Sequence, residues 1–122
     1  MDKELFDYVA KRADILSTAD SSKQETKAAA QAWKDAVAAD GSDGAVEAAT
    51  KKLVDYLDGR PRTIDGLIEF LAGPGKEVFG EERAAQALAA QQQRKNEGAK
   101  FCDCPSCTAA SEILAKFGRV EL

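Results

Sequence analysis

Apolar residues recur at intervals of three and four positions in every long segment of this chain, and no segment alternates apolar and polar residues as a strand does. Leu5, Val9, Ala13 and Leu16 illustrate the pattern, because these steps place them on one helix face. Alanine is abundant and β-branched residues are sparse, which also favours helices. The sequence therefore predicts an all-α fold, an irregular bundle of about six helices forming a single domain over residues 1–122.

Breaks rich in glycine, proline, serine or aspartate separate the predicted helices. Ser22 and Glu25 have the spacing of a capping box, which predicts that the second helix starts near Ser22. In a longer helix over residues 81–96, Ala85, Leu88 and Gln92 line up as a weak apolar face. The other expected helices cover residues 3–16, 44–57, 64–71 and 105–117, with a single turn around residues 78 and 79. Thr63 is placed to cap the short helix over residues 64–71.

Charge and hydropathy exclude several classes of partner. The net charge is −4, and basic residues are scattered among acidic ones. We therefore expect no nucleic-acid binding, which needs a clustered basic face, and no binding to an anionic membrane. The start, MDKELFDYVAKRADIL, lacks the basic region and apolar core of a signal peptide, and no apolar run is long enough to cross a bilayer. These features predict a cytoplasmic protein, whose cysteines stay reduced.

All three cysteines, Cys102, Cys104 and Cys107, lie in the stretch FCDCPSC, and the chain contains no histidine. An odd number of cysteines cannot form a complete internal disulfide framework. The stretch belongs to a loop over residues 98–107 that leads into the last predicted helix. In a reducing compartment, such a cluster indicates metal binding or redox chemistry first.

The spacing of the cluster predicts a site where three sulfurs meet one ion. Pro105 suits the first position of a helix, so Cys104 would be its N-cap and Cys107 would lie in its first turn. A helix N-terminus presents amide hydrogens and partial positive charge, which favour the thiolate form that binds metals. Cys102, on an extended loop two residues earlier, can fold back over the same point.

Zinc is the metal whose chemistry fits three thiolates best, since it is borderline soft and carries no redox cost. A closed zinc site takes four ligands, and this chain offers three thiols and no imidazole. The fourth ligand would be a distant carboxylate, a water or a group from a second chain. Copper(I) also accepts three thiolates, whereas an iron–sulfur cluster normally takes four cysteines.

Two other interpretations of the cluster remain open. Cys104 and Cys107 form a C-P-S-C motif at a helix start, so in a thiol-redox protein Cys104 would attack and Cys107 would resolve, whereas a metal-handling protein would exchange the bound metal. No βαβ pattern accompanies the motif, unlike in thioredoxin-like proteins. Alternatively, the thiols are reduced spectators in a turn.

The sequence favours a structural or interaction module over an enzyme. Without histidine or a serine–base constellation, hydrolytic chemistry has little support. We therefore expect a zinc ion that ties the polar helix over residues 81–96 and its cysteine loop to the last helix, with a homodimer or another protein as partner.

Four segments resemble a family of small bacterial helical proteins: LFDYV, AAAQAWKDAV, FGEERAAQ and AKFCDCPSCTAASEIL. The similarity covers most of the chain and implies that the Cys-x-Cys-Pro-x-Cys ending is a family feature, carried here by Cys102, Cys104 and Cys107. Some members carry a label linking them to the ninety-kilodalton heat-shock chaperone. This chain has neither the length nor the strands for that chaperone's ATP-binding domain, and the resemblance implies no particular activity.

Overall fold

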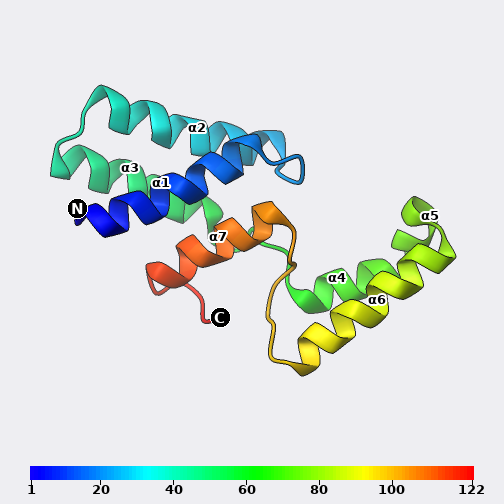
Figure 1. Ribbon diagram of the computed structural model, residues 1–122. Helices are drawn as coiled ribbons and strands as arrows, with labels where there is room; N and C mark the ends of the chain where they lie inside the picture. The colour runs from blue at the N-terminus through cyan, green and yellow to red at the C-terminus, as the bar shows by residue number, and fades with distance from the viewer. The chain divides into compact units, whose positions relative to one another are not determined.

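The computed structural model describes residues 1–122, and its secondary structure consists of helices (Figure 1). The only strand-like pairing is an isolated antiparallel bridge between Thr63 and Phe101. The all-α prediction is confirmed, with seven helices rather than about six, because the turn expected near residue 78 is a short helix. The helices are α1 (Lys3–Thr18), α2 (Gln24–Ala39), α3 (Asp43–Leu57), α4 (Ile64–Ala72), α5 (Gly75–Phe79), α6 (Glu81–Asn96) and α7 (Pro105–Lys116).

The helices group into two compact units. The first unit comprises residues 1–61 and 103–121, and it contains α1, α2, α3 and α7. The second comprises residues 62–102, with Leu122 grouped with them, and it contains α4, α5 and α6. The organisation of the whole chain as a single domain stays a prediction.

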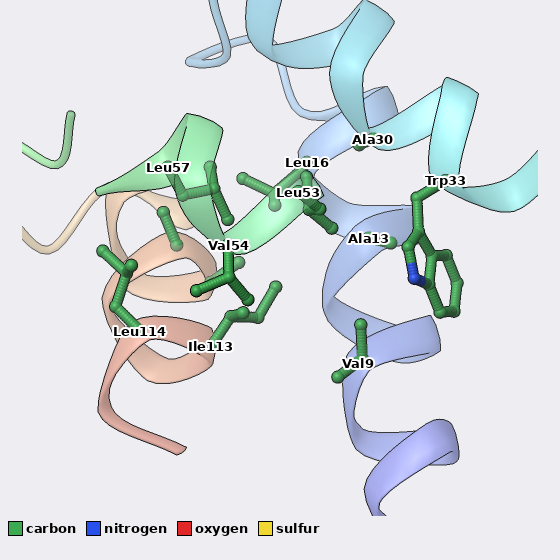
Figure 2. Close-up of a cluster of buried hydrophobic side chains, with 12 residues drawn as sticks. Val9, Ala13, Leu16, Ala30, Trp33, Leu53, Val54, Leu57, Ile113 and Leu114 are labelled. Atoms are coloured by element: carbon green, nitrogen blue, oxygen red, sulfur yellow. The ribbon is translucent and has the colours of Figure 1, made fainter. Parts of the chain in front are cut away.

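The core of the first unit is built by all four of its helices. Helix α1 packs against α2 and α7, and α3 packs against the same two helices. Figure 2 shows aliphatic side chains of α3 and α7 meeting beside those of α1. The buried cluster consists of Val9, Ala13, Leu16, Ala30, Trp33, Leu53, Val54, Leu57, Ala109, Ala110, Ile113 and Leu114.

Trp33 is the one large core residue with a polar atom, and that atom has a partner. Its indole nitrogen donates to Oγ1 of Thr50 at 2.9 Å, and Thr50 is itself buried. The ring of Phe6 lies 5.5 Å from the Trp33 ring, centroid to centroid. The hydrogen bond satisfies two buried polar groups, so α2 and α3 pack here without leaving an unpaired donor.

The start of α2 differs from the sequence prediction. Its N-cap is Lys23, and no side chain caps it, so the capping box expected from Ser22 and Glu25 is wrong. Ser22 is buried instead, and its hydroxyl donates to Oγ of Ser106 at 2.8 Å. A hydrogen bond to a residue distant in sequence has replaced the local one, which spacing alone does not indicate.

In the second unit, α4 packs against α5 and α6, and α5 packs against α6. Thr63 caps α4 as predicted, because its Oγ1 accepts from the backbone N–H of Gly66 at 3.1 Å. Helix α6 has the predicted bounds, but its buried residues are Ala84 and Gln91 rather than the expected face that includes Ala85 and Gln92. The polar composition of α6 gives a weak periodic signal, which is why the predicted buried face is shifted by one residue towards the C-terminus.

An exposed ion-pair cluster fastens the chain end after α7 to α3. Arg119 donates to Asp55 at 2.6 Å and to Asp58 at 2.8 Å. Hydrogen bonds from Lys51 and then from Arg119 lower the pKa of the Asp55 carboxyl below its usual range. Hydrogen bonds to Asp55 and then to Asp58 raise the pKa of the Arg119 guanidinium.

The Asp55 contacts should make the stability of the first unit depend on acid pH. A carboxyl whose folded pKa is lowered stabilises the fold above its unfolded pKa and loses that contribution as the pH falls through the folded value. Asp55→Asn should therefore unfold at lower urea concentration than wild type near neutral pH. The gap between the two midpoints should close between about pH 5 and about pH 2. A gap that is constant with pH would contradict this expectation.

Candidate metal centre

The first turn of α7 forms as the sequence predicts. Cys104 is the N-cap residue and Pro105 occupies the first helical position, where its missing N–H costs nothing. The Sγ atom of Cys104 accepts from the backbone N–H of Cys107 at 3.3 Å. Cys104 therefore uses its sulfur as a helix cap, as serine uses its oxygen at this position.

Two serines that precede α2 hold this turn in place. The backbone N–H of Ser106 donates to Oγ of Ser21 at 3.2 Å. Ser22 donates to Oγ of Ser106, and both side chains are buried. Because these contacts tie the start of α7 to the chain between α1 and α2, Cys104 and Cys107 stand on an anchored backbone.

The backbone around Cys102 is held by residues of the second unit. The N–H of Cys102 donates to the carbonyl oxygen of Arg62 at 2.8 Å. The carbonyl oxygen of Phe101, one residue earlier, accepts from the guanidinium of Arg94 at 3.1 Å. The N–H and the carbonyl of the single peptide group that joins Phe101 to Cys102 thus both have partners on other segments, which limits the conformations open to Cys102.

The three sulfur atoms of Cys102, Cys104 and Cys107 all lie within 4.8 Å of one another, and each residue is half-buried. In a tetrahedral zinc site with Zn–S bonds of about 2.3 Å, neighbouring sulfurs are roughly 3.8 Å apart. Side-chain shifts of about 1 Å would therefore bring the three sulfurs around one ion. The predicted cluster is present, and its three cysteines lie close enough together to hold one metal ion.

A cavity that the sequence analysis missed lies beside one of these cysteines. It has a volume of about 270 Å³, belongs to the first unit, and is lined by Cys107 together with residues of α2, α3 and the segment after α3. Among its lining residues are Lys23, Glu25, Tyr56 and Arg60. These residues are scattered along the chain, so only the packing of α2, α3 and α7 reveals that they share a cavity with a thiol.

No known protein family, curated protein or solved structure matches this chain. None of the helices has the length and apolar content that crossing a bilayer requires. The functional argument therefore rests on the chemistry of the cysteine cluster and its surroundings.

Proposed function

We propose that this chain is a small zinc-binding helical protein in which the ion has a structural role. The observation that carries the proposal is the meeting of three sulfurs within 4.8 Å, on a backbone held by hydrogen bonds on both sides. Three cysteines that fill a turn as spectators have no need to converge. Convergence of soft ligands is what a thiophilic ion requires.

Zinc is favoured over other thiophilic ions by the ligand set and by the reducing cytoplasm that we predict for this chain. Zinc binds thiolates without changing oxidation state, and three cysteine ligands are common in zinc sites. An iron–sulfur cluster would need a fourth cysteine, which the sequence lacks. Copper(I) is the competing ion, and direct measurement of bound metal separates the two.

A structural role follows from where the ligands lie along the chain. An ion bound by Cys102, Cys104 and Cys107 would close residues 102–107 into a ring and restrain the segment that leads from α6 into α7. Zinc binding of this kind adds its free energy to the stability of the folded state. We propose that the restrained segment serves in contact with a second copy of the chain or another protein.

The metal content of the untagged protein, purified under reducing conditions, tests the proposal. We expect one zinc per chain by elemental analysis and by native mass spectrometry. One zinc per two chains would instead show that a second chain completes the site in a dimer. A protein without metal whose three thiols all titrate would contradict the proposal. A reversible disulfide between Cys104 and Cys107 in that protein would support the thiol-redox alternative.

A further inference from the structure

The cavity beside Cys107 carries groups that recognise an anion. Two cationic side chains, Lys23 and Arg60, line it, against one carboxylate, Glu25. The hydroxyls of Thr26 and Tyr56, 3.3 Å apart, add hydrogen-bonding capacity to its wall. The excess of positive charge in a confined, partly polar space favours a small anionic ligand.

Arg60 is oriented before any ligand arrives. Its Nε donates to the carbonyl oxygen of Tyr56 at 2.6 Å, and its guanidinium carbon lies 4.1 Å from the centre of the Tyr56 ring. The hydrogen bond involves Nε and the ring contact involves the face of the guanidinium. Neither contact involves the two terminal nitrogens, which can therefore bind a carboxylate. Because the side chain is already ordered, binding loses less rotamer entropy than it would at a mobile arginine.

Cys107 connects this cavity to the metal centre. Among the three clustered cysteines, it alone lines the cavity. A zinc ion held by three thiolates has one coordination position to fill, and an incoming ligand needs space beside the ion. The cavity offers that space next to a ligand residue.

We propose that the fourth ligand of the metal is a small organic thiol that also carries a carboxylate and is bound in this cavity. Its sulfur would bind the ion held by Cys102, Cys104 and Cys107, and its carboxylate would bind Arg60. On coordination, the thiol releases its proton to solvent and its sulfur displaces a water, so no electron transfer is involved. This inference rests on the zinc site proposed above.

Two thiols of similar size separate recognition of charge from ligation by sulfur. The probes are 3-mercaptopropionate, which carries a carboxylate, and 2-mercaptoethanol, which is neutral. Each is titrated into the protein loaded with Co²⁺ in place of zinc, and binding is followed by the sulfur-to-cobalt charge-transfer absorption. We expect mercaptopropionate to bind roughly tenfold more tightly than mercaptoethanol, because one charge-assisted hydrogen bond contributes about that much affinity.

A matched pair of arginine variants tests whether the preference for the carboxylate-bearing thiol depends on Arg60. Arg60→Gln should bind the two thiols equally. Arg83→Gln, which makes the same charge change at an exposed position of α6 that does not line the cavity, should keep the wild-type preference. Circular dichroism of the variants confirms that each remains folded.

The possible outcomes distinguish this inference from the zinc proposal. Equal affinity of wild type for the two thiols, or an unchanged preference in Arg60→Gln, would overturn the inference and leave the zinc site standing. Loss of Co²⁺ binding in Glu25→Gln without added thiol would make Glu25 the fourth ligand and would also overturn it. A wild-type protein that binds no Co²⁺ under any condition would overturn both proposals.

Discussion

Cys104→Ser should abolish stoichiometric zinc binding while leaving the start of α7 capped, and Cys104→Ala should remove both the zinc and the cap. Cys104 has two tasks in the structure, since its Sγ accepts from the N–H of Cys107 and also belongs to the three-sulfur cluster. Serine is among the best N-cap residues but is a poor zinc ligand, so it preserves the first task alone. The two variants therefore separate local capping from metal binding.

The expected effects differ in size as well as in kind. In metal-free protein, Cys104→Ser should be as stable as wild type, and Cys104→Ala should lose about 1 kcal/mol of unfolding free energy. With free zinc roughly a thousandfold above its dissociation constant, wild type should gain about 4 kcal/mol that neither variant gains. Chemical unfolding with zinc and with a chelator measures both differences. A zinc-dependent gain that persists in Cys104→Ser would contradict ligation by this residue.

Ile113→Ala should destabilise the first unit by about 3 kcal/mol, within the range seen when a large aliphatic side chain is removed from a core. Ile113 is fully buried within the cluster of α1, α2, α3 and α7 side chains, and the residue lies on α7, six positions after Cys107. The cost has two parts, the lost burial of the aliphatic side chain and the space left behind, because close-packed neighbours relax only in part.

A matched surface change controls for the loss of aliphatic atoms as such. Val78 of α5 is 65 % exposed, so Val78→Ala should change the unfolding free energy by less than about 0.5 kcal/mol. Urea unfolding midpoints of wild type and both variants provide the comparison. An Ile113→Ala protein with the wild-type midpoint would show that the α7 core contact contributes little to stability.

Features encoded by neighbouring residues could be predicted from the sequence, and features encoded by distant ones could not. Thr63 and Cys104 cap their helices as expected, because an N-cap interaction involves residues two or three positions apart. The same kind of prediction was wrong for Ser22, because its hydroxyl donates to Ser106 on α7 and does not cap α2. The face of α6 was misplaced because alanine and glutamine, which dominate that helix, barely distinguish one side from another.

The part of the candidate site that neighbouring residues form could likewise be predicted, and the part that distant residues form could not. The three cysteines lie within six consecutive positions, so their meeting followed from the helix start and the short loop before it. The cavity wall combines residues from α2, the end of α3 and the start of α7, and Arg60 is placed there by its contacts with Tyr56. Zinc as the bound ion, a dimer or protein partner, and the family resemblance stay predictions.

The hydrogen-bonded indole of Trp33 gives the protein an internal reporter for one of its two units. The single tryptophan and both tyrosines, Tyr8 and Tyr56, belong to residues 1–61, while residues 62–102 contain only phenylalanine among the aromatic residues. Intrinsic fluorescence is therefore blind to the melting of α4, α5 and α6, whereas far-ultraviolet circular dichroism registers every helix. Superposition or separation of the two melting curves would tell whether the two units unfold as one cooperative body.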